Sequence, residues 1–248
     1  MNRERQLAQT FVALSDTYAA EFDPLGLFHR LVHACTALLD ADAAAVMIGD
    51  ARGSLKTMAT TDEDAAFIEL LQVQTGQGPC MECYRTARPM AVPDIATEYT
   101  RWPKLVGVML ETGYGALQAV PMQLHDRPVG VLTLLRGSTG RLPDNNMHLA
   151  QALADSATLG LMHWSTEPTR GDDVITRVQS IIAAKATLDI AKGMLAQHAD
   201  VGVGEAARLL HAYVTLRRLR LTDTAHALVT RELDLSEVAQ GQRLPGAP

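Results

Sequence analysis

The sequence of 248 residues lacks long hydrophobic runs, and none approaches the roughly 20 consecutive apolar residues of a membrane span. Its opening, MNRERQLAQTF, is polar and is not followed by the apolar core and cleavage site of a signal peptide. Cysteine is scarce, and the odd set of Cys35, Cys80 and Cys83 favours free thiols in a reducing compartment. No His, Cys and Asp residues cluster at metal-ligand spacing. We therefore expect a cytoplasmic protein with no membrane partner, metal or cofactor.

Positive charge is also in short supply. The chain has 22 Lys and Arg against 28 Asp and Glu, a formal net charge of −6 that argues against a globally basic nucleic-acid binder. The acidic excess lies entirely in residues 1–171, whereas residues 172–248 hold nine basic and nine acidic residues. Arg217, Arg218 and Arg220 crowd together in this neutral part. Any nucleic-acid site is therefore expected there.

The N-terminal two-thirds combines helices and strands. Leu7, Phe11, Leu14 and Tyr18 form a heptad-like stripe, which predicts a helix within residues 1–21. Residues 22–165 read as one α+β domain, an antiparallel sheet with flanking helices. Its predicted strands are 43–48, 55–60, 90–92, 116–121 and 129–136. Its predicted helices are one opening at Asp23-Pro24, then 61–71, a short helix after the loop 74–80, 103–111 and 144–163.

The remainder reads as all-α. Pro and Gly interrupt the pattern at residues 166–172, a predicted linker, and three helices follow within 173–232. The first, 174–198, has a coiled-coil-like apolar stripe, the second covers 205–216, and Thr222 is expected to cap the third. Residues 233–248 are expected to form a flexible tail. Three helices bury little surface alone, so we expect a homodimer formed through the first helix. The apolar stripe of that helix consists of Val174, Val178, Ile181, Leu188 and Leu195.

This C-terminal part resembles the ANTAR family over about residues 174–230. The resemblance lies in Ala191-Lys-Gly-Met-Leu195, Glu205-Ala206, Leu209-Leu210 and Leu221-x-Asp-x-Ala225. It implies a dimeric helical module that binds paired RNA hairpins and acts by transcription antitermination. The candidate RNA-binding residues are Lys185, Lys192, Gly193, His211, Arg217, Arg218 and Arg220, and the alternative for the three arginines is a plain solvated face. His211 and Arg218 stand where the family usually has other residues, which bears on RNA preference and affinity.

Lys192-Gly193 is unusual because glycine inside a helix costs about 1 kcal/mol relative to alanine. We expect Gly193 to let another helix backbone approach closely, and Lys192 to offer a compact cation to phosphate. The alternative for Lys192 is an ordinary solvated side chain. Arginines can pair with phosphates or stack on loop bases, whereas Tyr213, the one nearby aromatic, is expected in the core.

The earlier part is similar to GAF domains, over about residues 22–165. The resemblance lies in Thr75-Gly-Gln-Gly-Pro-Cys80, Arg88-Pro89, Val92-Pro-Asp94, Arg101-Trp-Pro103 and Ala119-Val-Pro121. It implies an α+β sensory module with an unknown small-molecule ligand. Candidate ligand or redox residues are Gly78, Cys80, Cys83, Asp94 and Trp102.

The predicted function is a signal-responsive RNA-binding regulator without enzyme activity. One alternative is a DNA-binding helix-turn-helix in residues 205–231. Another uses Cys80 and Cys83, which lie at a helix start where thiol pKa values can fall, as a redox sensor or a methionine sulfoxide reductase. We expect instead that both cysteines pack as small apolar residues. A third alternative is a C-terminal domain that binds protein partners and no nucleic acid.

Overall fold

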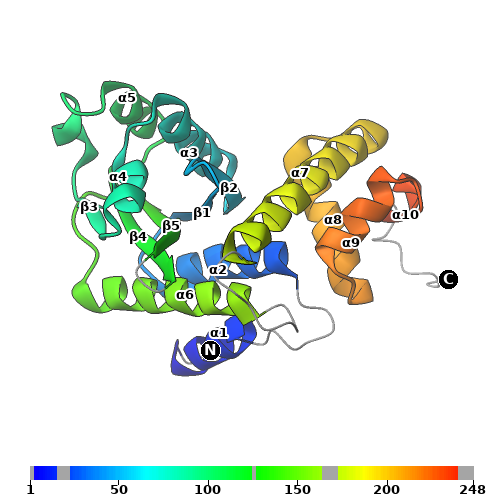
Figure 1. Cartoon of the computed structure of the whole chain (residues 1–248). Coiled ribbons are helices and arrows are strands. Elements are labelled where there is room, and N and C mark those ends of the chain that lie inside the picture. The colour runs from blue at the N-terminus through cyan, green and yellow to red at the C-terminus, as the bar shows by residue number, and fades with distance from the viewer. Residues whose placement is uncertain (1–2, 16–22, 125–126, 164–172, 240–248) are drawn as a thin grey trace. The chain divides into compact units, whose positions relative to one another are not determined.

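The computed structural model describes residues 3–15, 23–124, 127–163 and 173–239. The chain divides into two compact units: residues 1–18 with 27–178 form unit 1, and residues 19–26 with 179–248 form unit 2 (Figure 1). Tyr18, the predicted linker 166–172 and the end of the predicted tail lie outside the described residues. None of the helices within the described ranges has the length and apolar character that a membrane crossing requires.

Unit 1 is built on a five-stranded antiparallel sheet with the order β2-β1-β5-β4-β3. The strands are β1 (Ala43–Gly49), β2 (Leu55–Thr60), β3 (Met90–Val92), β4 (Ala116–Leu124) and β5 (Arg127–Arg136). All five predicted strands are present, which confirms the α+β architecture. β4 continues past Pro121, where the sequence pattern ended it. β3 pairs only with residues 117–119, so β4 is an edge strand at Pro121 and proline is tolerated there.

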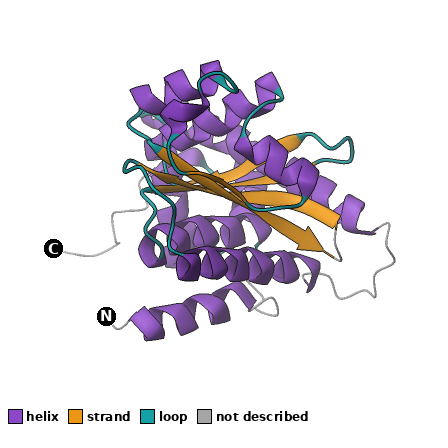
Figure 2. Ribbon diagram, turned by 90° about the vertical axis from the view of Figure 1, so that its left-hand side faces the viewer, coloured by secondary structure: helices purple, strands orange, loops and turns teal. Residues whose placement is uncertain are grey.

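Helices cover both faces of this sheet (Figures 1 and 2). One face carries α3 (Glu63–Thr75), α4 (Pro79–Thr86) and α5 (Pro103–Glu111), with the short 3-10 helix η1 (Ile95–Glu98) between the last two. The other face carries α2 (Pro24–Leu38) and α6 (Asp144–His163), and α1 (Arg3–Ser15) packs on α6.

The helix α3 differs most from its prediction, which was 61–71. It begins at Glu63 because Asp62 is its N-cap, accepting a hydrogen bond from the Ala65 N–H at 2.7 Å. It continues to Thr75 because the first left-handed glycine, Gly76, follows only there. Its C-terminal turn therefore extends beyond the predicted end and carries polar residues toward the start of α4.

The core of unit 1 follows the predicted apolar pattern. The inward face of α2 is fully covered: Phe28, Leu31, Val32, Cys35 and Leu38 are at most 5% exposed. A second cluster of buried residues lies between the sheet and α3, α4 and α5, and it includes Met47, Ile68, Met109 and Val131. Three polar residues, Glu69, Gln72 and Thr133, are also completely buried. No periodicity argument anticipated them.

Unit 2 is all-helical, as predicted. Its helices are α7 (Asp173–Ala199, whose first residues belong to unit 1), α8 (Val203–Arg217), α9 (Leu221–Val229) and α10 (Leu235–Ala239). Four residues of the predicted α7 stripe are buried, namely Val178, Ile181, Leu188 and Leu195.

Two local predictions in this unit are wrong. Thr222 does not cap α9, because the helix already begins at Leu221 with Arg220 in the N-cap position. Residues 235–239, placed in the tail, form α10 instead. Asp234 accepts hydrogen bonds from the Ser236 N–H and hydroxyl, and Val238 is buried, so a local cap and an apolar contact stabilise this turn.

Candidate functional site

The α3–α4 junction has a backbone that only glycine accommodates. Gly76 ends α3 in the left-handed conformation, and Gly78 has φ 128° and ψ 164°, a region almost restricted to glycine. A Cβ on Gly78 would lie 2.3 Å from the side-chain oxygen of Gln72. Gly78 was predicted as a ligand residue, and the structure shows that its missing side chain leaves room for Gln72.

Gln72 takes the place of a helix cap at the start of α4. Gly78 offers no side chain to this end, and Pro79 has no N–H. The Gln72 Oε1 accepts the Cys80 N–H at 3.0 Å, while its Nε2 donates to Cys80 Sγ at 3.1 Å and to Glu69 Oε2 at 3.2 Å. At least one N–H of α4 is therefore used within the protein and does not face a ligand.

The two predicted redox cysteines are both fully buried, and all three cysteines are free thiols. Burial raises the pKa of Cys83 to about 12. Burial and the neighbouring Glu69 raise the pKa of Cys80 well above its usual value. The redox alternative depended on depressed thiol pKa values, and these are not found, whereas the burial of both side chains agrees with the expectation that they pack as small apolar residues. Sequence placed these thiols at a helix N-terminus, but desolvation outweighs the helix dipole.

Glu69 is the residue that sequence reasoning missed. Its carboxyl group lies 3.6 Å from Cys80 Sγ, and the same sulfur lies 3.1 Å from the Thr133 hydroxyl of β5. Burial raises the pKa of Glu69 to about 7, although hydrogen bonds from Thr133 and Cys80 oppose the shift. The available signal was spacing: Glu69 is four residues after Ala65 and follows Ile68, on the face that α3 buries.

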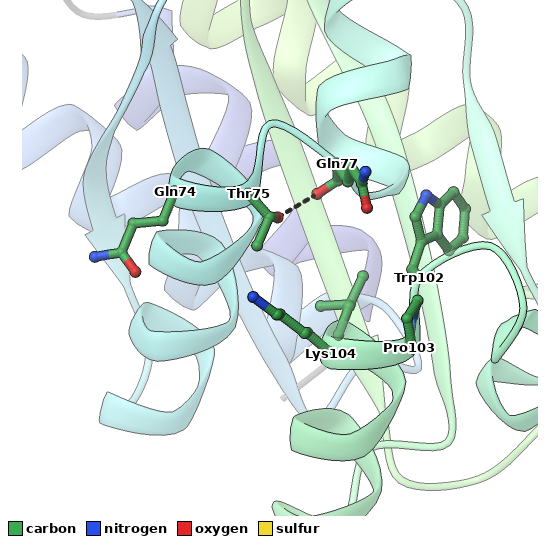
Figure 3. A pocket seen from close by; sticks show the side chains of 7 residues that line it. Gln74, Thr75, Gln77, Trp102, Pro103 and Lys104 are labelled. Carbon is green, nitrogen blue, oxygen red and sulfur yellow. Dashed lines mark hydrogen bonds between the residues drawn. The ribbon is translucent and has the colours of Figure 1, made fainter.

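A cavity of about 310 Å³ opens beside this junction (Figure 3). Its wall combines polar side chains with the ring of Trp102, which is 3% exposed. The lining residues are Gln74, Thr75, Gln77, Trp102, Pro103, Lys104 and Leu105. They come from the end of α3, the 75–78 loop and the start of α5, so segments about 25 residues apart in the chain form one wall.

Of the five predicted GAF residues, Trp102 is the one placed in this wall. Cys80 and Cys83 lie in the core, and Asp94 is the N-cap of η1, accepting from the Ala96 N–H at 3.0 Å. Arg101 stacks over the Trp102 ring at 4.3 Å and pairs with Glu82 of α4. The described residues contain no group of His, Cys, Asp and Glu arranged to hold a metal ion.

The five-stranded antiparallel sheet with helices on both faces is the α+β architecture that the sequence predicted. The family model for the GAF domain matches residues 23–162, more than half of the chain. The chain belongs to the GAF domain family. No curated protein matches it significantly.

Several solved GAF structures are similar to the chain. The GAF domain of a phosphoenolpyruvate-protein phosphotransferase from Coxiella burnetii has a TM-score of 0.52 at 20% identity, over 66% of this chain and 94% of that one. The corresponding Acinetobacter domain scores 0.51 at 12% identity, over 66% and 95%. A free methionine-R-sulfoxide reductase from Neisseria meningitidis, in complex with its substrate, scores 0.51 at 12%, over 65% and 89%. At these identities the likeness establishes the GAF fold and nothing finer.

In unit 2, the predicted cations of α7 are not isolated. Lys185 forms an ion pair with Asp189, and Lys192 lies 3.9 Å from the same carboxylate. The Lys192 side chain is only 12% exposed. Burial, helped by Lys185, lowers the pKa of Lys192, and Asp189 partly restores it. Asp189 was missed, although its spacing of four and three residues from the two lysines is readable in the sequence.

Gly193 does not have the role expected within the chain. It lies on the exposed side of α7, and a Cβ there would meet nothing within 4 Å. No helix among the described residues approaches it closely, so a close helix contact at Gly193 stays a prediction for a partner copy. Gly193 belongs to an exposed heptad-spaced stripe with Ala183, Ala186 and Ile190.

The predicted arginines lie at the turn between α8 and α9. Arg217 and Arg218 are exposed, and Arg217 stacks over Tyr213 at 4.1 Å. Tyr213 is 5% exposed, which confirms its place in the core. Arg220 lies 3.6 Å from Asp223, and His211 is half-buried in α8. The turn thus presents two exposed guanidinium groups on a short, well-packed support.

Proposed function

We propose that the protein is a signal-responsive RNA-binding regulator acting by transcription antitermination, in which the GAF domain senses a small molecule and unit 2 binds paired RNA hairpins. The observation that carries the proposal is the exposed pair Arg217 and Arg218 at the α8–α9 turn, within a sequence that resembles ANTAR. Guanidinium groups bind phosphates through several N–H donors and also stack on splayed bases. Leu216 and Leu219, 60% and 46% exposed, flank them and offer apolar contacts to such bases.

The proposal includes a homodimer, because two hairpins call for two copies of the binding surface. The exposed stripe of Ala183, Ala186, Ile190 and Gly193 on α7 supports it. These residues recur at intervals of three and four, the spacing of a coiled-coil seam. Ile190 is 54% exposed in the single chain, and small neighbours would let a second helix approach. This is the face on which we place the partner copy.

Binding to hairpin RNA tests the proposal. The full chain should bind a pair of stem-loops more tightly than duplex DNA at the same, stated salt concentration. Replacing Arg217 and Arg218 by Ala should weaken RNA binding by roughly tenfold or more and lower the salt-dependence slope by about 1 to 2, because each lost phosphate contact contributes up to about 0.9. Fluorescence anisotropy at several salt concentrations measures both quantities.

Arg208→Ala is the matched control, since Arg208 is also an exposed arginine of α8 and pairs only locally with Glu205. It should leave RNA affinity nearly unchanged. Preference for duplex DNA would favour the helix-turn-helix alternative, and no binding to either would favour a protein partner. Either outcome contradicts RNA recognition.

Signal coupling is the remaining part of the proposal. The cavity beside Trp102 has the volume of a small-molecule site and combines an ammonium group, amides and an aromatic ring. A compound that stabilises the GAF domain thermally should change the RNA Kd of the full chain. An identical Kd with and without such a compound would contradict the coupling.

A further inference from the structure

The carboxyl group of Glu69 is buried, and within the described part of the chain its hydrogen-bond partners include no basic side chain. Glu69 is 0% exposed, on the face of α3 that packs against the sheet. Three polar groups surround it: the Gln72 amide of the same helix, the Cys80 thiol of α4 and the Thr133 hydroxyl of β5. Among the described residues, no basic group contributes to the pKa of Glu69. An ionised carboxylate in this place would lack the partner that buried charges normally require.

Among the described residues, the other elements around Glu69 contribute no positive charge that could pair with its carboxylate. The second titratable neighbour on α4, Cys83, raises the pKa of Cys80 further. The strands β1, β2 and β4 and the helix α5 contribute apolar residues to this core, among them Met47, Leu55 and Leu117. A negative charge on Glu69 therefore meets one thiol, one hydroxyl, one amide and hydrocarbon, without a basic group among the described residues. The donors from Gln72, Cys80 and Thr133 stabilise that charge only in part, because burial still raises the pKa of Glu69 to about 7, and water entering the core would stabilise it further.

The entry route follows from the hydrogen bonds of Gln72. This side chain joins Glu69 to the first turn of α4 through the Cys80 N–H and Sγ. The loop that leads to Cys80 includes Gln77, which lines the 310 Å³ cavity. Displacing Gln72 would free the start of α4 and move this wall. The protonation state of Glu69 and the shape of the cavity wall are thus linked through one amide.

We propose that Glu69 is a proton switch of the GAF domain: with its carboxyl protonated the α3–α4 junction stays closed, and release of the proton to water opens the junction and the adjoining cavity wall. The switch lies wholly within the GAF domain, so it does not depend on RNA binding. The closed junction loses stability as the pH rises from the ordinary glutamate pKa, about 4.3, to the Glu69 pKa of about 7. Because the neutral acid is the form that fits the folded core, the closed junction is favoured at lower pH and lost as the pH rises.

The first measurement is the titration of Glu69 itself, in the wild-type full chain. Carbon-13 NMR of labelled glutamate, assigned with the Glu69→Gln variant, should show one carboxyl with a pKa near 7. The ordinary pKa range of an exposed glutamate side chain lies at about 4.3. A Glu69 pKa in that ordinary range would overturn the proposal. If the Glu69→Gln variant does not fold, the Glu69 signal can still be assigned in the wild type by assigning the signals of the other glutamates first.

The second measurement is the access of a small soluble maleimide to Cys80, followed by peptide mass spectrometry. The ratio of the wild-type labelling rate to the Glu69→Gln labelling rate should rise roughly tenfold between pH 6 and pH 8.5, because pH 6 lies about one unit below the Glu69 pKa and the closed junction keeps losing stability up to that pKa. The charge of Glu69 raises the pKa of Cys80, which by itself would slow labelling of the wild type. Faster labelling therefore reports opening and not thiol acidity.

Glu111→Gln is the control, because it removes one exposed carboxyl from α5 and should keep the wild-type pH dependence. Equal labelling of wild type and Glu69→Gln at both pH values would refute the switch, even if Glu69 titrates near neutral pH. Together the two measurements separate a buried acid that merely titrates from one that opens the junction.

Discussion

Gly78 and Gln72 show how single residues shape the α3–α4 junction. Gly78 adopts φ 128° and ψ 164°, and the space where its Cβ would lie is occupied by the Gln72 amide. That amide then caps α4 and contacts Glu69 and Cys80. Glycine at this position therefore does two things: it permits the backbone conformation, and its missing side chain leaves space for the Gln72 amide. The second purpose is invisible in the sequence because Gln72 lies six residues earlier in another helix.

Replacing Gly78 by Ala should destabilise unit 1 by about 2–4 kcal/mol, because backbone strain of about 1–3 kcal/mol is added to the loss of buried hydrogen bonds. Urea unfolding followed by circular dichroism measures the change. Gly140→Ala is the control: Gly140 has φ 117°, and its nearest neighbour would lie 3.9 Å from the new Cβ. It should lose only the strain contribution. Equal losses for both variants would mean that Gln72 moves aside without cost.

At the scale of an element, α7 combines three features on one helix. Its apolar stripe is buried, its exposed side carries small residues, and Lys185 and Lys192 share the carboxylate of Asp189. The helix periodicity of the sequence predicted the first feature. The spacing of the two lysines is also visible in the sequence. Asp189 makes these lysines weaker phosphate ligands, because its carboxylate neutralises part of their positive charge. On the proposed function, Asp189 weakens RNA binding.

Replacing Asp189 by Asn should therefore tighten RNA binding by a few-fold, on the order of 0.5–1 kcal/mol, the usual range for a partly exposed ion pair. Anisotropy titrations at low salt detect this, and the gain should shrink as salt rises. Glu232→Gln makes the same change in net charge at another exposed position of unit 2. If both variants gain RNA affinity equally, the gain comes from the change in net charge, and the position of Asp189 beside the two lysines does not matter.

At the scale of the whole molecule, the chain joins a GAF sensor to a helical unit that is small for an independent fold. In unit 2 the apolar stripe residues Ile181, Leu188 and Leu195 of α7 are buried. Ile190 and the small residues Ala183, Ala186 and Gly193 stay exposed. Small helical units often complete their core through a partner. The proposed homodimer would cover this stripe and bring two RNA-binding turns into one particle.

Replacing Ile190 by Lys should convert the protein to a monomer at micromolar concentration, because lysine at a coiled-coil seam is poorly tolerated. Sedimentation velocity measures the change, and binding of paired hairpins should fall with it. Val203→Lys is the control, since Val203 is 57% exposed on α8 and lies off the stripe. A wild-type protein that is monomeric under the same conditions would contradict this part of the proposal.

Local sequence features determined most of the architecture. Alternating and helical apolar patterns depend on neighbouring residues, so all five strands, α2, α5 and α6 were predicted closely. The GAF resemblance was also readable, because glycine and proline at turns record backbone conformation directly. Helix ends were less predictable. α3 extends to Thr75, with Gly76 as its C-cap, and Asp234 with a buried Val238 produces α10, because caps and tertiary contacts decide where helices stop.

The chemistry of the candidate site was decided by tertiary structure alone. Burial raises the pKa of Cys80 and Cys83, although a helix N-terminus by itself can lower a thiol pKa, and it keeps the Glu69 carboxyl away from water. Folding also brings Trp102 and Lys104 against the end of α3 to form the cavity. The sequence by itself determined which elements form and which residues are charged. Desolvation and long-range contacts decide what those charges do, because both depend on segments far apart in the chain.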